Sequence, residues 1–99
     1  LEIRFVRGDE AWLSPAHGRD TVHLGAYATE SDDQRAYFEA FGRLAKAALA
    51  RPHWGKECAL DPAYVRAVFP ACGRFLALRD ALDPARVLTN AYLERALGA

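Results

Sequence analysis

The sequence predicts an α+β fold: a small antiparallel sheet packed with a long helix, followed by further helices toward the C-terminal end. Three observations predict it. Apolar and polar residues alternate in two short stretches near the start, which is typical of strands. One amphipathic stretch with a helical repeat comes next. The rest of the chain contains short apolar stretches that follow helix-capping residues.

The length and the charge balance limit the possible classes of protein. The chain has 99 residues, enough for one domain. Its 13 basic and 13 acidic residues cancel, which predicts no nucleic-acid partner. No apolar run reaches the ~20 residues that span a bilayer, and no signal-peptide pattern is present. We expect a cytoplasmic location, with membrane association left open. The chain starts inside an expected strand without an initiator Met, which indicates a piece of a longer protein.

The two alternating stretches cover residues 1–7 and 21–29. The connection between them is too long for a tight hairpin, but antiparallel pairing remains open. In each stretch, side chains point alternately to opposite faces. The first stretch places Glu2 and Arg4 on one face. The second places His23, Gly25 and Tyr27 opposite its apolar side chains.

The long helix is expected from a capping box at residues 31–34 to about Ala50. Its apolar stripe consists of Tyr37, Phe38, Phe41, Leu44, Ala45, Ala48 and Leu49. Three shorter helical stretches follow. The first begins at Asp61-Pro62, the second restarts at Pro70 and ends before Asp83-Pro84, and the third runs from Asn90 to Leu97.

Most sequence signatures of catalysis are absent. There is no glycine-rich phosphate loop, no nucleophile elbow and no zinc-protease motif. The three His residues and Cys58 lack metal-ligand spacing, so we predict no metal site. Cys58 and Cys72 are expected to be buried or half-buried thiols rather than a disulfide scaffold.

Two groups of residues are candidates for chemistry. Glu2 and Arg4 lie two residues apart on one strand face. They form either a solvated sheet face or a carboxylate and a guanidinium aimed into a pocket, where Arg4 would donate to an oxygen that gains negative charge. The segment His53–Lys56 places Trp and Gly beside one of only two lysines. It is either a turn with a packed Trp or a dry setting for Lys56.

Four blocks of the sequence resemble one enzyme family. Arg51-Pro-His-Trp-Gly-Lys56 resembles the R-P-H-W-[GA]-K motif of sugar-1,4-lactone oxidases and alditol oxidases, flavin enzymes of the vanillyl-alcohol oxidase superfamily. Glu2-Ile-Arg4 resembles their E-[IVL]-R strand. The remaining blocks resemble their W-L-S-P…R-D and L-D-P…N-x-[YF]-[LV] segments; here they are residues 12–20 and 82–93. The resemblance covers essentially the whole chain.

The resemblance implies that residues 1–99 are the C-terminal substrate (cap) region and closing helices of a two-domain, FAD-dependent enzyme. The FAD-binding domain, absent from this chain, would hold most of the cofactor and be the chain's partner. The substrate would be a small polyol or sugar lactone. Lys56 and Arg4 would be catalytic. Substrate would contact Glu2, Arg4, His23 and Tyr27, and the cofactor would contact His53, Lys56 and Asn90.

The implied reaction is hydride transfer from a hydroxyl-bearing carbon to flavin N5. We assign Lys56 and Arg4 to stabilise developing charge, and Glu2 to orient substrate hydroxyls rather than to act as a base. The sequence departs from the polyol-oxidising members at Gly25 and Tyr27, where those members carry His and Thr, so the substrate stays open. We expect this fragment alone to be inactive and prone to self-association. The rival interpretation is a stand-alone binding or dimerisation module without chemistry.

Overall fold

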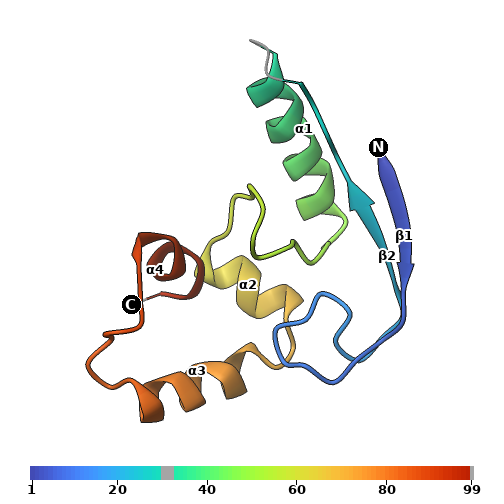
Figure 1. The fold of residues 1–99 in the computed structure, drawn as a ribbon. Helices are drawn as coiled ribbons and strands as arrows, with labels where there is room; N and C mark the ends of the chain where they lie inside the picture. Colours follow the sequence, from blue (N-terminus) through green and yellow to red (C-terminus); the bar gives the residue numbers. More distant parts are fainter. Residues whose placement is uncertain (30–32, 99) are drawn as a thin grey trace.

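The computed structural model describes residues 1–29 and 33–98 (Figure 1). Strands β1 (Glu2–Val6) and β2 (Thr21–Gly25) form a two-stranded antiparallel sheet. The helices in these residues are α1 (Gln34–Ala47), α2 (Pro62–Val68), α3 (Cys72–Leu82) and α4 (Ala91–Leu97). Figure 1 shows α1 beside the strands, with α2, α3 and α4 gathered at the other end of the molecule. The predicted α+β class, with an antiparallel sheet, is confirmed.

The sheet exposes its apolar face and partly covers its polar one. The register pairs Glu2 with Gly25 and Arg4 with His23, and directly paired residues share a face. Glu2, His23 and Gly25 are half-buried. The opposite face carries side chains that are at least 53% exposed: Ile3, Phe5, Val22 and Leu24. This is the reverse of the usual arrangement in a sheet with one solvated face.

Both strands are shorter than predicted. The second was expected over residues 21–29 but ends at Gly25. In the register, Gly25 pairs with Glu2, the first residue of β1, and the described strand pairing ends at that pair.

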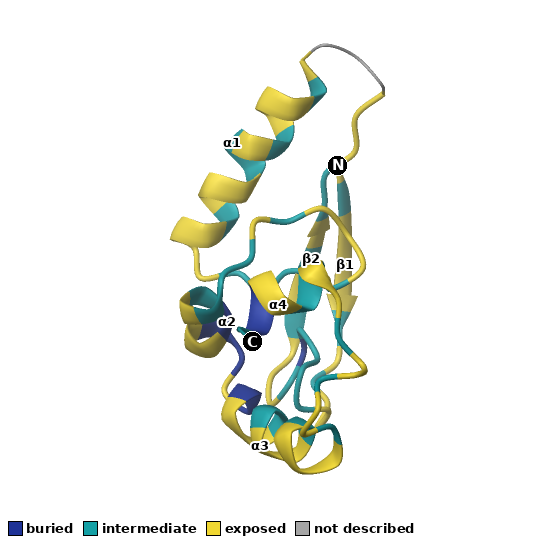
Figure 2. Cartoon of the chain, turned by 90° about the vertical axis from the view of Figure 1, so that its left-hand side faces the viewer, coloured by how far each residue is buried: buried dark blue, intermediate teal, exposed yellow. Residues whose placement is uncertain are grey.

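Helix α1 is the long helix that the apolar stripe predicts, but it ends at Ala47 rather than near Ala50. Leu49 adopts a positive φ of 52°, which ends the helical path. Residues 31 and 32 of the predicted capping box lie outside the described residues, and Asp33 makes no side-chain cap bond. No residue of α1 is buried (Figure 2), and Leu44 is 72% exposed. The predicted stripe is therefore largely uncovered in this chain.

The core lies between α2, α3 and α4. Its buried members are Val65, Val68, Phe69, Cys72, Ala96 and Leu97. The predicted cap Asp61 is confirmed, and Asn90, expected as the first residue of the last helix, is its cap; each side chain accepts a bond from the backbone N–H three residues later. The predicted restart at Pro70 was wrong by two residues, because α2 ends in an extended Phe69 and residues 70–71 form a turn before α3.

The two cysteines match their predicted settings: Cys58 is half-buried, Cys72 is buried, and both are free thiols. In the described ranges, no helix combines the length and the apolar character that crossing a membrane requires.

Candidate functional site

The polar face of the sheet carries a connected cluster of three side chains. Arg4 donates from Nε to Glu2 Oε1 at 2.6 Å, and the Tyr27 hydroxyl donates to Glu2 Oε2 at 2.5 Å. Both oxygens of the carboxylate therefore hold a donor. The side chain of Glu2 is 38% exposed and that of Arg4 is 66% exposed, so the cluster is open to a ligand.

The cluster keeps Glu2 ionised. The hydrogen bond from Arg4 lowers the pKa of Glu2 most, the bond from Tyr27 lowers it further, and burial raises it by less. The same contact with Glu2 raises the pKa of Tyr27, which stays a donor. A carboxylate with a depressed pKa is a poor general base. This agrees with the assignment of Glu2 to orienting hydroxyls.

His23 faces Arg4 across the sheet. Its Nε2 atom is buried and has no hydrogen-bond partner among the described residues, and the same holds for the Thr21 hydroxyl. Buried polar atoms in proteins nearly always have a partner. On this face of the sheet, His23 Nε2 and the Thr21 hydroxyl therefore lack hydrogen-bond partners among the described residues.

The segment 50–58 carries the second group of predicted residues. It closes as a turn, in which the Lys56 N–H donates to the His53 carbonyl at 3.1 Å. The Gly55 N–H donates to His53 Nδ1 at 3.0 Å. The His53 ring thereby shapes the turn, and His53 is itself exposed. His53 and Lys56, which the sequence predicts to contact cofactor, lie in one turn.

Arg51 fastens the start of this segment. Its guanidinium donates to the carbonyls of Val68, Pro15 and His17 at 2.6, 3.2 and 2.7 Å. Burial lowers the pKa of Arg51, and no carboxylate pairs with it among the described residues. A single side chain thus joins the loop before β2, the segment 50–58 and the end of α2.

Trp54 fastens the middle of the segment. Its indole N–H donates to the Leu13 carbonyl at 2.8 Å, and its ring packs on the buried Phe69 with centroids 5.1 Å apart. The Trp54 carbonyl accepts from the Tyr92 hydroxyl at 2.8 Å. Trp54 is therefore held both at its side chain and at its backbone.

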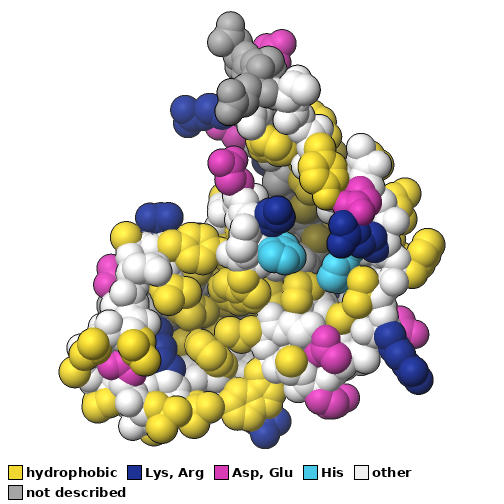
Figure 3. Space-filling view, in the orientation of Figure 1, with side chains coloured by type: hydrophobic (Ala, Val, Ile, Leu, Met, Phe, Trp, Pro, Cys, Tyr) yellow, Lys and Arg dark blue, Asp and Glu magenta, His cyan; other side chains and the backbone are white. Residues whose placement is uncertain are grey.

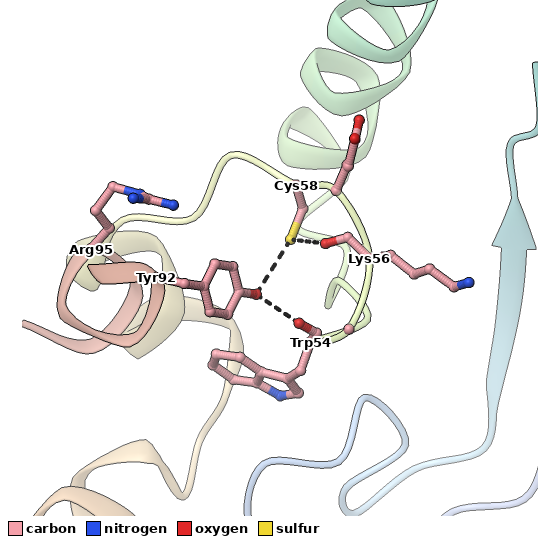
Figure 4. A pocket seen from close by; sticks show the side chains of 7 residues that line it. Trp54, Lys56, Cys58, Tyr92 and Arg95 are labelled. Atoms are coloured by element: carbon pink, nitrogen blue, oxygen red, sulfur yellow. Dashed lines mark hydrogen bonds between the residues drawn. The ribbon is translucent and has the colours of Figure 1, made fainter. Parts of the chain in front are cut away.

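An open hollow of about 490 Å³ lies beside this turn. Figure 4 shows the Tyr92 hydroxyl pointing to Trp54 and Cys58, while the Lys56 side chain extends the other way, toward the side of the view where β2 runs. Lys56 is exposed and makes no ion pair in the part of the chain that the structure describes. The lining residues are Trp54, Gly55, Lys56, Glu57, Cys58, Tyr92 and Arg95.

Figure 3 shows His side chains and Lys or Arg side chains close together in the middle of one face, between the helical part and the strands. Asn90, the third predicted cofactor residue, does not line the hollow. Its side-chain oxygen caps α4 by accepting from the Leu93 N–H at 2.9 Å. Within residues 1–29 and 33–98, no group of three or more metal-binding side chains comes together.

The sequence did not predict how the site is held. The roles of Arg51, Trp54 and Tyr92 as anchors emerge only from the structure, although all three lie in blocks that carry the family resemblance. A signal was available, since an indole N–H or a phenol in an apolar stretch needs a bonding partner when buried. The partners of these three anchors lie 17 to 41 residues away along the chain, so the sequence does not identify them.

The comparisons with known proteins agree along the whole chain. Residues 1–96 match the family described as D-arabinono-1,4-lactone oxidase. The L-gulono-1,4-lactone dehydrogenase of Mycobacterium tuberculosis is 39% identical over 98 residues, which are 99% of this chain and 23% of that protein. The alditol oxidase of a Streptomyces species is 43% identical over 95 residues, which are 93% of this chain and 22% of that protein.

A vertebrate relative extends the same pattern. The L-gulonolactone oxidase of Bos taurus is 35% identical over 99 residues, which are 96% of this chain and 22% of that protein. The chain therefore spans less than a quarter of the length of these curated relatives. Because the family match runs from residue 1 to residue 96, this chain belongs to the D-arabinono-1,4-lactone oxidase family of oxidoreductases.

Proposed function

We propose that this chain forms the substrate side of an FAD-dependent oxidoreductase that oxidises a CH–OH group of a sugar lactone or an alditol. The observation that carries the proposal is the inverted sheet. Its half-covered face holds Glu2 and its two donors, and its apolar face is left outside. The polar face remains open to a ligand, since the side chain of Arg4 is 66% exposed, and its charged groups keep free acceptor and donor positions. Family membership supports oxidation as the reaction.

The residues around the hollow fit a flavin's edge. Trp54, Tyr92 and Arg95 line one opening, and the Lys56 side chain extends from the same turn toward β2 (Figure 4). A bound flavin would accept a hydride from the substrate and gain negative charge. Lys56 suits that charge, because its ammonium is not already paired with a carboxylate of the described residues. A preorganised cation at such a position stabilises charge that develops in the transition state.

Each residue of the sheet cluster has a role in this proposal. Glu2 accepts hydrogen bonds from substrate hydroxyls, because an ionised carboxylate offers about four acceptor positions and two are occupied here. Arg4 uses only Nε on Glu2, and its remaining N–H groups donate to a substrate oxygen. His23 lies beside Arg4 on the same face of the sheet. Such paired acceptors and donors suit a polyhydroxylated molecule.

The chain by itself does not enclose a dinucleotide. We propose that the FAD-binding domain is another part of the same protein, since the relatives are more than four times as long as the matched region. The uncovered residues of α1 and of the outer sheet face would pack against other parts of that protein. We propose a cytoplasmic location for it.

The test is to purify the complete protein that contains this chain and to mix it, without oxygen, with L-gulono-1,4-lactone and with xylitol. The proposal expects a yellow protein whose flavin absorbance bleaches with at least one of these compounds. The 99-residue chain alone should stay colourless and inactive with added FAD. A complete protein without flavin would favour the rival binding module, and a flavoprotein that no lactone or polyol reduces would overturn the proposed substrate class.

A further inference from the structure

Tyr27 reaches Glu2 across a residue that has no side chain. It follows β2 by two positions, and its hydroxyl still bonds Glu2, which pairs with Gly25. A Cβ atom added at Gly25 would lie 2.9 Å from Cε2 and 3.1 Å from the hydroxyl oxygen of Tyr27. The Tyr27 ring therefore occupies the space that any other residue at position 25 would fill.

The displaced group would be the ring and not the backbone. Tyr27 is 62% exposed, and the atoms nearest to the added Cβ all belong to its side chain. A side chain at position 25 can thus push the ring aside while the strand pairing of Gly25 with Glu2 remains. Because Gly25 has no side chain, the Tyr27 ring can lie over it and its hydroxyl can bond Glu2.

That contact fixes the carboxylate before a ligand arrives. Arg4 holds one oxygen from β1, and Tyr27 holds the other from beyond β2. A glutamate held at both oxygens has fewer rotamers to lose when a ligand binds, which strengthens binding without a new contact to the ligand. The two hydrogen bonds also fix the orientation of the carboxylate, and so the directions in which its remaining lone pairs can accept.

We propose that Tyr27 is a positioning residue that acts through Glu2, and that Gly25 and Tyr27 together determine how tightly this protein binds hydroxyl-bearing substrates. The proposal rests on the proposed function, in which Glu2 accepts substrate hydroxyls. It assigns Tyr27 a role one step away from the substrate.

Two substitutions break the contact in different ways. Tyr27→Phe keeps the ring over Gly25 and removes the hydroxyl, whereas Gly25→Ala keeps the hydroxyl and displaces the ring. In the complete flavoenzyme, each should raise KM by up to about tenfold, the usual cost of immobilising one free side chain on binding, with kcat little changed. The double variant should be no worse than either single one, because both remove the same bond.

Matched controls separate this effect from general damage. Tyr37→Phe removes an exposed hydroxyl of α1, and Gly73→Ala adds a methyl group in α3 with nothing within 4 Å. Both should leave KM unchanged. Unchanged KM in Tyr27→Phe as well as Gly25→Ala would overturn the proposal.

A pH readout tests positioning independently of turnover. The side chains that act on Glu2 are Arg4 and Tyr27. His23 lies opposite Arg4. Because Tyr27 lowers the pKa of Glu2, both variants should raise that pKa, and substrate binding should then be lost at a higher pH on the acid side.

The pKa of Glu2 is measured by NMR of the carboxyl-labelled complete protein, with Asp61 as an internal control because neither variant touches it. An upward shift at Glu2 alone supports the proposal, and no shift overturns it. A shift at Glu2 with an unchanged KM would confirm the contact but remove Glu2 from substrate binding, so it would count against the proposed function. If Gly25→Ala does not fold, Tyr27→Phe carries the same test.

Discussion

At the scale of single residues, Lys56 is the side chain on which the proposed chemistry depends most. The turn that carries it is held by the bonds of Trp54 on both sides of the segment. The chain offers a matched comparison, since its only other lysine, Lys46, pairs with Asp61 at 2.8 Å on the exposed side of α1. The two lysines therefore differ in their setting and not in their chemistry.

We predict that Lys56→Met in the complete protein slows flavin reduction by about 10²–10³-fold, the usual effect of losing one preorganised donor. Substrate affinity should change much less, because the charge that Lys56 stabilises exists only during the reaction. Anaerobic stopped-flow reduction measures both quantities. Lys46→Met is the control and should leave the reduction rate unchanged. A Lys56→Met rate within about threefold of the wild type would remove Lys56 from the site.

At the scale of the elements, local sequence and structure agree best at the starts of α2 and α4. Asn90 begins α4 with its side-chain oxygen on the Leu93 N–H. The family resemblance also assigns Asn90 to the cofactor, and its amide N–H₂ group is the part that the cap does not use. These two roles need different atoms of one side chain, so two substitutions separate them.

We predict that Asn90→Ala lowers the free energy of unfolding by about 1 kcal/mol, the typical effect of losing an N-cap. Asn90→Asp should keep the stability, because Asp is an equally good cap and its charge suits a helix N-terminus. Chemical denaturation measures both. If Asn90 also contacts FAD through its N–H₂ group, Asn90→Asp should lose flavin affinity while its free energy of unfolding stays unchanged. Asn90→Ala removes both the cap and the N–H₂ group, so it does not separate the two roles. Equal flavin retention in wild type and Asn90→Asp would leave Asn90 with the cap alone.

At the scale of the whole molecule, much apolar surface is uncovered. The outer sheet face exposes Ile3, Phe5, Val22 and Leu24, and α3 exposes Leu78 and Leu82 by 46% and 76%. The sheet residues lie in cross-strand register and form one continuous surface. Exposed apolar patches of this kind mark interaction sites or cause association.

We predict that the 99-residue chain self-associates and that the outer sheet face is the main cause. The double variant Phe5→Ser with Leu24→Ser should shift the chain toward monomer, because it breaks the continuous surface. The pair Leu78→Ser with Leu82→Ser is the control and should have a smaller effect. Sedimentation velocity over a range of concentrations measures this. A wild-type chain that stays monomeric with high thermal stability would contradict the prediction.

The local features of the sequence determined the order of the elements and where α2 and α4 begin. Asp61 and Asn90 begin helices because their short side chains bond the backbone within one turn. Glu2 and Arg4 share a face because strand geometry alternates. The motif blocks also led to the family, which the comparisons confirm. All of these depend on residues a few positions apart, so the sequence alone contains them.

The tertiary structure decided which face of the sheet is covered and how the site is held. Alternation predicts two faces but does not say that the apolar one is exposed while Glu2 and His23 on the polar one are half-buried. The contact of Tyr27 with Glu2 joins residues 25 positions apart, and the bond of Trp54 to Leu13 joins residues 41 positions apart. Such contacts depend on how the elements pack together. The spacing of neighbouring residues does not predict that packing, because the partners come together only when distant elements of the chain pack against one another.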